Sequence, residues 1–153
     1  MKKFITYLLL LSCMGFVSQV NAETYRMPSL ETTNTYVTKF LQHQKNINDM
    51  GRKLVSDNNI FVQSERLYYG TSIAYHTGAE LLLVIRIHDH LLDSRDKNYV
   101  QQYIQEGIRH NIAQAELAIE VINGLMVEIH NPALLSEAEK TRNDIQNFAA
   151  SLQ

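Results

Sequence analysis

The side chains that could do chemistry in this sequence are histidines and carboxylates on predicted helices. His76 and Glu80 lie four residues apart, as do Glu106 and His110, so the members of each pair share one helix face. Such a pair can bind a metal when a second helix adds carboxylates. The Glu-x-x-His spacing of di-iron bundles is absent, because no glutamate is followed three residues later by a histidine. The sequence therefore predicts no metal centre.

Other motifs that carry chemistry are also absent from the sequence. It has no glycine-rich phosphate loop, no Gly-x-Ser-x-Gly turn and no His-Glu-x-x-His pair. His88 and His90 would point about 200° apart on a helix, so they cannot bind one metal ion from a regular turn. Haem is not expected, because the last predicted helix contains no histidine. The sequence predicts no catalytic residue and no cofactor, with an enzyme of unfamiliar type as an alternative.

The apolar periodicity predicts four helices and no strands. The segments run from Ser29 to about Ser56, from Ile60 to about Leu92, from Lys97 to His130, and from Pro132 towards the C-terminus. Ser29 is a suitable N-cap for the first helix, and Asn131 followed by Pro132 is typical of a helix start. Long helices joined by short turns pack as antiparallel neighbours, so we expect an all-α, up-down-up-down four-helix bundle.

A ligand pocket between the second and third helices is one alternative for function. If their connecting turn centres near Ser94-Arg95, antiparallel pairing places Gly78 opposite Asn111 and Glu80 opposite Arg109. The last two residues are then expected to form an interhelical ion pair. The competing interpretation is a metal or small-ligand site. Its candidate residues are His76, Gly78, Glu80, Arg109 and Asn111.

Five of the six glycines fall inside predicted helices, where each costs about 1 kcal/mol relative to alanine. Gly70, Ala74 and Gly78 form a small-residue stripe on the second helix, and Gly107 and Ala115 belong to another on the third. We expect the two stripes to face each other, because small residues let helix backbones approach closely. The alternative is a cavity or a kink that admits a ligand.

The second helix also has more apolar surface than two neighbouring helices would cover. Residues Leu81–Ile87 are apolar on almost every side, whereas a surface helix needs one stripe about 100° wide. Nearby tyrosines are typical of protein interfaces. We therefore expect either that the bundle wraps this helix more fully than usual, or that an envelope protein or a second copy of the chain binds here. The candidate partner-binding residues are Tyr68, Tyr69, Tyr75, Leu83 and Ile87.

The N-terminus has the pattern of a secretory signal peptide. Lys2 and Lys3 precede an apolar run from Phe4 to Leu11, and Val20-Asn21-Ala22 places small residues at the positions that signal peptidase recognises. The run is shorter than the roughly 20 residues that cross a membrane. A lipoprotein box ending at Cys13 is the alternative interpretation. We expect cleavage after Ala22, which leaves residues 23–153 as one helical domain in the periplasm or outside the cell.

Cleavage would change the composition of the protein. The full chain has 153 residues, one cysteine and a net charge of -2, whereas residues 23–153 would be 131 residues with 12 basic and 16 acidic side chains, a net charge of -4 and no cysteine. Thiolate chemistry is then excluded, and this charge does not favour nucleic acid. The sequence predicts an exported helical protein that occupies a protein partner in the envelope, as an inhibitor, immunity-type antidote or chaperone does. A purely structural role is the remaining alternative.

Overall fold

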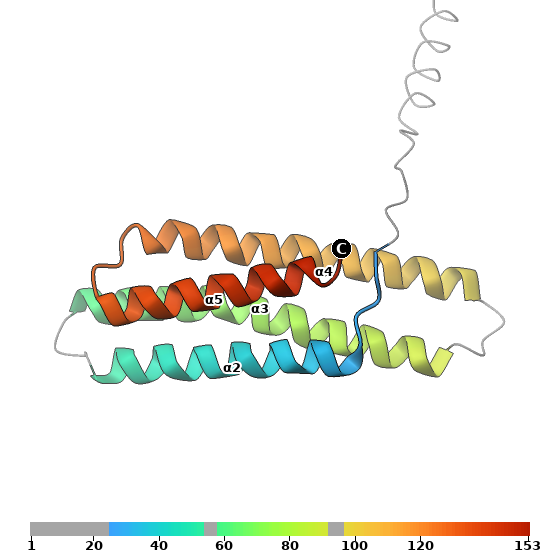
Figure 1. Cartoon of the computed structure of the whole chain (residues 1–153), viewed down its shortest axis with the longest axis horizontal. Coiled ribbons are helices and arrows are strands. Elements are labelled where there is room, and N and C mark those ends of the chain that lie inside the picture. Colours follow the sequence, from blue (N-terminus) through green and yellow to red (C-terminus); the bar gives the residue numbers. More distant parts are fainter. Residues whose placement is uncertain (1–24, 54–57, 92–96) are drawn as a thin grey trace, which may run out of the picture.

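The computed structural model describes residues 25–53, 58–91 and 97–153, and the predicted signal peptide lies outside these ranges. The described residues form four helices and no strand, and the helices lie side by side in one elongated bundle (Figure 1). The helices are α2 (Leu30–Lys53), α3 (Asn58–Leu91), α4 (Lys97–Met126) and α5 (Pro132–Ala150). Within these ranges, no helix is both long enough and apolar enough to span a membrane.

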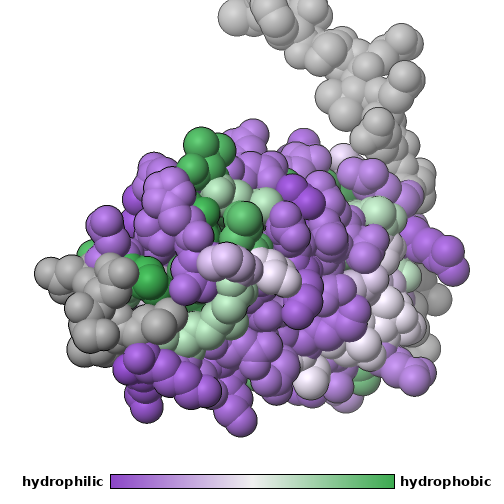
Figure 2. Space-filling model, turned by 60° about the vertical axis from the view of Figure 1, so that its left-hand side comes forward, coloured by the Kyte–Doolittle hydropathy of each residue, from purple (hydrophilic) through white to green (hydrophobic). Residues whose placement is uncertain are grey.

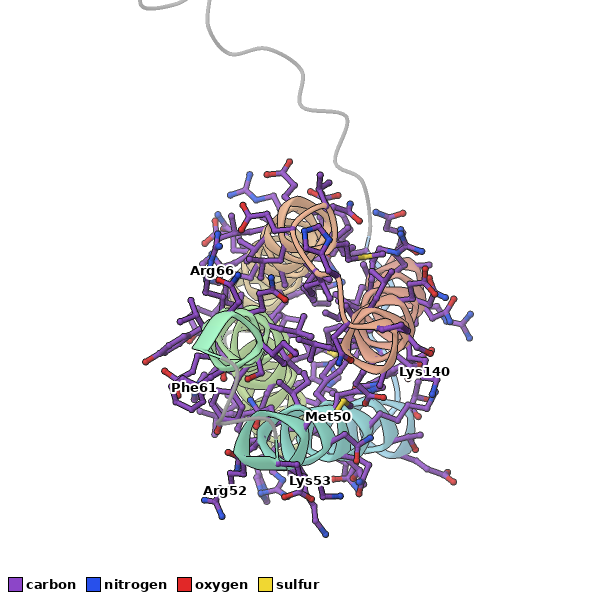
Figure 3. All side chains as sticks on the ribbon, turned by 90° about the vertical axis from the view of Figure 1, so that its left-hand side faces the viewer. Met50, Arg52, Lys53, Phe61, Arg66 and Lys140 are labelled. Atoms are coloured by element: carbon purple, nitrogen blue, oxygen red, sulfur yellow. The ribbon has the colours of Figure 1, made fainter. Side chains whose placement is uncertain are left out.

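The four helices surround one core in the order α2, α3, α4, α5, which is seen when the bundle is viewed along its axis (Figure 3). Three of the neighbouring pairs run antiparallel, because the residue number falls on one helix as it rises on the other. The contacting residues are Gln44 with Ser72 and Val37 with Gly78 between α2 and α3, Gly70 with Ile122 and Gly107 with Val84 between α3 and α4, and Lys39 with Asp144 and Asn46 with Glu137 between α2 and α5.

The helix starts that the sequence predicts are confirmed at both described caps. The Ser29 hydroxyl accepts a hydrogen bond from the backbone N–H of Thr32 at 3.0 Å. At the start of α5, the Asn131 side chain accepts from the N–H groups of residues 133 and 134, and Pro132 occupies the first turn. Each cap satisfies N–H groups that the helix leaves unpaired, which stabilises a helix by about 1 kcal/mol.

The third helix ends four residues earlier than expected. The sequence predicts a helix to His130, but α4 ends at Met126, after which the N–H of Glu128 bonds the carbonyl of Leu125 at 2.9 Å. This three-residue spacing is a tightened final turn. The chain then bends so that Ile129 is buried in the core, while Val127 is exposed. The helix therefore ends early because the bend buries Ile129, and this burial is more favourable than one further helical turn.

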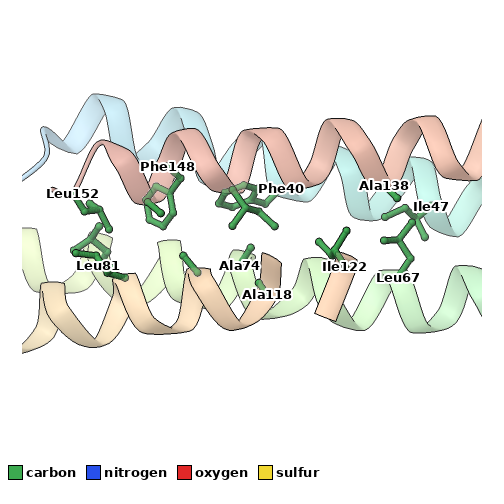
Figure 4. Packing of buried hydrophobic residues seen from close by; sticks show 14 of the residues in the cluster. Phe40, Ile47, Leu67, Ala74, Leu81, Ala118, Ile122, Ala138, Phe148 and Leu152 are labelled. Carbon is green, nitrogen blue, oxygen red and sulfur yellow. The ribbon is translucent and has the colours of Figure 1, made fainter. Parts of the chain in front are cut away.

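The core is a continuous column of apolar side chains from all four helices (Figure 4). Phe40 of α2 and Phe148 of α5 pack edge to face, with ring centroids 5.7 Å apart, and both are fully buried. Such pairs contribute about 1 kcal/mol beyond their buried area. Further along the column, Ile47 and Leu67 lie close to Ala138 in Figure 4. The inner faces of all four helices therefore contribute side chains to one continuous core.

The two predicted glycine stripes do not face each other. A Cβ atom at Gly70 would lie 3.2 Å from Ile122 on α4, but one at Gly78 would lie 2.7 Å from Val37 on α2. Eight residues turn a helix by about 80° beyond two full turns. A stripe of residues four apart therefore winds around α3 from the α4 side to the α2 side. Close packing at each glycine is real, but it involves two different neighbours.

Candidate functional site

An open groove of about 430 Å³ lies between the outer sides of α3 and α4. We call it the outer groove. It is lined by Arg66 and Tyr69 of α3, by Glu120, Val121, Gly124 and Leu125 of α4, and by Glu128. In the end-on view, Arg66 points outward from α3 on the side nearer α4 (Figure 3). The groove is therefore a surface feature that sequence spacing alone does not reveal.

Gly124 leaves the wall of the outer groove open. A Cβ atom built on Gly124 would meet no atom within 4 Å, so packing within the chain does not require glycine there. A glycine in a helix is less stable than an alanine by about 1 kcal/mol. By contrast, a Cβ at Gly70, on the inner side of α3, would contact Val121 and Ile122. Gly124 therefore exposes its backbone to solvent in the groove rather than to another helix.

The outer groove has one more acidic side chain than basic side chains. Arg66 forms an ion pair with Glu128, and the Gln63 side chain donates to the backbone carbonyl of Glu128 at 2.8 Å. Both members of the ion pair are about half exposed, so the pair contributes little to stability. Glu120 also lines the groove and is exposed. Because Arg66 is balanced by Glu128, Glu120 gives the groove a negative charge that suits a basic group.

Exposed apolar side chains are also present elsewhere on the two helices that form this groove. On α3, Tyr69 and Leu83 are 68% and 58% exposed. On α4, Tyr103 and Leu117 are exposed, and Val127 just beyond its end is 82% exposed. In the face of the molecule shown in Figure 2, hydrophobic residues form separate patches within a mainly hydrophilic surface. The apolar surplus noted in the sequence is thus present on the outside of the bundle.

The predicted partner-binding residues divide between two sides of α3. Tyr69 and Leu83 lie on its outer face, and Ile87 is partly exposed. Tyr68 is exposed and stands edge to face with Tyr69, but it lines a smaller cavity of about 150 Å³ shared with α2. Tyr75 is partly buried against the core. The structure thus brings together only part of this group on one face.

The predicted ligand-pocket residues are not gathered into one pocket. His76, Glu80 and Arg109 are exposed, and the described residues include no ion pair between the last two. Gly78 faces α2, so the expectation that it lies opposite Asn111 is wrong. Two features separate Gly78 from Asn111. The small-residue stripe winds around α3, and the register between α3 and α4 is shifted.

The register between α3 and α4 differs from the expected one by two residues. Antiparallel pairing about Ser94-Arg95 predicts Leu82 opposite Gly107, but a Cβ at Gly107 would contact Val84, at 3.5 Å. Asn111 is nevertheless fully buried, and its amide donates to the carbonyl of Gly107 at 2.8 Å. Its Oδ1 atom is buried and accepts no hydrogen bond from the described residues. Asn111 is therefore an inner, polar core residue.

A buried polar cluster that the sequence did not indicate joins α2 to α5. The Nδ1 atom of His43 lies 2.8 Å from Oε1 of Glu137, and its Nε2 atom lies 3.1 Å from Oδ2 of Asp144. Asn46 donates to the same Glu137 oxygen at 2.8 Å, and Lys39 donates to Oδ1 of Asp144 at 2.7 Å. His43 and Glu137 are both buried. Only an imidazolium carries N–H groups on both ring nitrogens, so the protonated ring satisfies both carboxylates at once.

Electrostatics within this cluster act on Asp144 and Lys39. Burial raises the pKa of Asp144, but the hydrogen bonds and positive charges of Lys39 and His43 outweigh it, so the pKa is lowered overall. The hydrogen bond to Asp144 raises the pKa of Lys39 despite a small opposing effect of burial. Both ring nitrogens of His43 are occupied by carboxylates, which leaves neither to act as a base on a substrate. The cluster is therefore a tether between helices.

A sequence signal for this cluster does exist. Between Phe40 and Ile47 the buried stripe of α2 continues through His43 and Gln44, positions that apolar residues would normally occupy. Glu137 occupies a buried position of the same kind on α5. A charged side chain at a core position is rare unless it is paired. The spacing could therefore have shown that each of these residues needs a buried partner, but it could not have identified that partner.

Groups of three or more metal-binding side chains are absent from the described part of the chain. Comparison of the chain with models of protein families, with curated proteins and with solved structures finds no match. The function proposed below consequently depends on the groove, its charges and its exposed side chains.

Proposed function

We propose that this protein is an exported binding protein of the cell envelope, which acts by occupying a protein partner with the outer groove and its apolar margins. The observation that carries the proposal is the open groove beside Gly124, lined by Tyr69 and Val121. Inhibitors, immunity-type antidotes and holding chaperones all work by such occupation and need no catalytic group. Export is inferred from the Lys2–Ala22 leader pattern.

The shape of the surface favours a protein over a small molecule. The groove is open to solvent, and exposed apolar residues continue beyond it to Tyr103 at one end of α4 and Val127 at the other. Those two residues are 24 positions apart, a distance of about 36 Å along a helix. A small ligand cannot contact a surface of that length. An amphipathic helix of a partner can, because it presents apolar side chains at regular intervals along one face.

The chemistry of the groove defines the segment that fits it. The space at Gly124 accepts one large apolar or aromatic side chain, which Tyr69 and Val121 would flank. Glu120 would pair with a lysine or arginine next to that side chain. Central aromatic or aliphatic anchors of this type supply most of the affinity of protein interfaces. We therefore expect a partner helix that carries an apolar anchor beside a basic residue.

Two matched substitutions test this proposal. Leu117 on α4 and Leu41 on α2 are almost equally exposed, at 44% and 45%. Leu117 is one helical turn from Glu120 and Val121 of the groove wall, whereas α2 contributes no residue to the groove. We expect Leu117→Glu to abolish recovery of the partner from envelope extracts, whereas Leu41→Glu retains it. Equal loss in both variants, or no loss in either, would contradict the proposal, because capture would then not depend on the groove face.

A third variant separates blocking from unfolding. Gly124→Leu adds a side chain where the chain leaves open space, so circular dichroism and the unfolding midpoint should show an intact fold. The same variant should lose the partner, because the new side chain fills the groove. Retained binding by a folded Gly124→Leu protein would show that the partner binds elsewhere.

The alternative function is a metal or small ligand held between α3 and α4. One observation favours it, namely the buried Oδ1 of Asn111, which accepts no hydrogen bond from the described residues. Metal analysis of protein prepared without a histidine tag tests the metal half of this proposal. A metal content below one ion per ten chains would remove that half.

A further inference from the structure

The outer face of α3 has a repeat that the bundle core does not use. Apolar residues recur on this face at intervals of four, seven and ten, and with the polar residues between them they follow the period of about 3.5 residues that is found in packed helix pairs. They are Val62, Tyr69, Ile73, Leu83 and Ile87. Val62, Tyr69 and Leu83 are exposed, and the other two are partly exposed. The row is distinct from the fully buried row that includes Leu67, Ala74 and Leu81.

Polar residues occupy the remaining positions of the same face. Arg66, His76 and Glu80 complete the repeat, and all three are exposed. Glu65 and Arg86 lie beside the row, on the side of α3 that packs towards α2. These charges have opposite sign and stand near opposite ends of the helix. A surface with this arrangement is complementary to itself when reversed end to end, which is what a twofold interface requires.

We propose that two copies of this protein associate through the outer faces of α3, which pack antiparallel about a twofold axis near the middle of the helix. This self-association goes beyond the proposed function, because it uses the whole face of α3, which shares Arg66 and Tyr69 with the outer groove but not the α4 wall at Gly124. In the proposed register, Tyr69 of one copy faces Glu80 of the other, and Ile73 faces His76. The hydroxyl of Tyr69 can then donate a hydrogen bond to the Glu80 carboxylate.

The outer layers of this register are also matched. Val62 faces Ile87 of the second copy, which buries two apolar side chains together. Arg66 faces Leu83, and its methylene groups cover the leucine while its guanidinium stays at the edge with Glu128. Each of these contacts occurs twice because of the symmetry. The row therefore buries its apolar members, with the Glu80 carboxylate bonded to the Tyr69 hydroxyl and the Arg66 guanidinium at the edge of the interface.

The charges beside the row select this register. In an antiparallel pair, positions on the same flank of the two helices meet. Glu65 of each copy then meets Arg86 of the other, which gives two ion pairs. A shift of one heptad in either direction separates these residues by about 10 Å, so neither pair can form. Charge complementarity thus favours a second copy as the occupant, and one register over its neighbours.

The length of the contact is sufficient for a stable dimer. From Val62 to Ile87 the row spans 25 residues, or about 38 Å of helix. Paired helices of this length, together with the flanking side chains, reach the scale of about 800 Å² per partner that is typical of specific interfaces. The axis keeps α4 of both copies on the same side of the α3 pair. The Gly124 walls of the two grooves would therefore lie on the same side of the dimer, while the Tyr69 side of each groove would be covered.

A charge exchange tests the proposed register. We expect the protein to sediment as a dimer, and Arg86→Glu to weaken association by about tenfold or more, because each ion pair becomes a repulsion. The exchanged variant, Glu65→Arg with Arg86→Glu, should recover the dimer, since opposite charges meet again. Wild-type protein that sediments as a monomer at all concentrations would overturn the proposal. Failure of the exchange to restore the dimer would overturn the register.

Cysteine cross-linking provides a second, independent readout. In a background that lacks Cys13, copies carrying Tyr69→Cys should form a disulfide with copies carrying Glu80→Cys. Neither variant should cross-link with itself, because like positions lie about 16 Å apart along the helix in this register. Self-linked products of equal yield would contradict the antiparallel arrangement. Arg86→Glu should still capture the envelope partner, so failure of the dimer and failure of the proposed function are distinguishable.

Discussion

The Nδ1 atom of His43 on α2 lies 2.8 Å from Oε1 of Glu137 on α5, although 94 residues separate them in the chain. Asn46 donates a hydrogen bond to the same oxygen of Glu137. The other ring nitrogen of His43, Nε2, lies within hydrogen-bond distance of Oδ2 of Asp144. The two helices that begin and end the bundle are thus joined by a buried, charge-assisted network. Breaking such a network from one side leaves a charge in the core without its partner.

We expect His43→Leu to destabilise the protein by about 3 kcal/mol, because the buried Glu137 carboxylate then loses its hydrogen bond to the His43 ring. The double variant His43→Leu with Glu137→Leu should recover more than half of this loss, since no charge stays buried. Urea unfolding measures both. Lys39→Met serves as the control and should cost less than about 1 kcal/mol, because Lys39 is exposed. A double variant no more stable than His43→Leu would count against the network.

Acid should weaken the fold through Asp144. Its pKa is lowered in the folded protein, so its contribution is present above the usual value of 3.8 and is lost as the pH falls through the folded value. The free energy of unfolding should therefore fall below about pH 4, and Asp144→Asn should flatten that limb. Unchanged acid dependence in the variant would contradict the assignment.

At alkaline pH, the free energy of unfolding should fall as the pH rises, because of Lys39. The pKa of Lys39 is raised above 10.5, so its contribution is present below that value and is lost as the pH rises through the folded value. Lys39→Met should remove this small loss, as unfolding midpoints on either side of pH 10.5 would show.

Two glycine substitutions should change stability in opposite directions. At Gly78 a Cβ would lie 2.7 Å from the buried Val37 side chain, so Gly78→Ala should destabilise the protein by about 1 kcal/mol or more despite the gain in helix propensity. At Gly124 the same change meets open space and should stabilise it by about 1 kcal/mol. Thermal unfolding of the two variants in parallel tests the pair. Equal shifts of the same sign would show that local propensity alone decides both.

Asn111 is the polar member of the buried face of α4. Its Oδ1 atom accepts no hydrogen bond from the described residues, and an unsatisfied buried acceptor costs about 1–3 kcal/mol. We therefore expect Asn111→Leu to stabilise the fold by about 1 kcal/mol. Asn111→Ala is the control, because it removes the amide without adding apolar volume. Marked destabilisation by the leucine variant would indicate that Oδ1 has a donor, such as an internal water.

The candidate site was partly accessible from the sequence. Leu83, within the apolar excess on the second helix, and Tyr69, among its tyrosines, were chosen from the sequence as partner-binding candidates, and both are exposed. The outer groove was not foreseen, because its walls come from two helices whose register depends on the packing between them. A shift of two residues in that register was enough to place Val84, rather than Leu82, opposite Gly107.

The sequence by itself determined the local features of the protein. The helical segments, the Ser29 cap and the Asn131–Pro132 start follow from hydrogen bonds and periodicities within a few residues. Tertiary structure decided which faces meet. Gly78 turns to α2, and His43 meets Glu137 across the bundle. These pairings depend on how whole helices fill the core together, a condition that no short stretch of sequence contains.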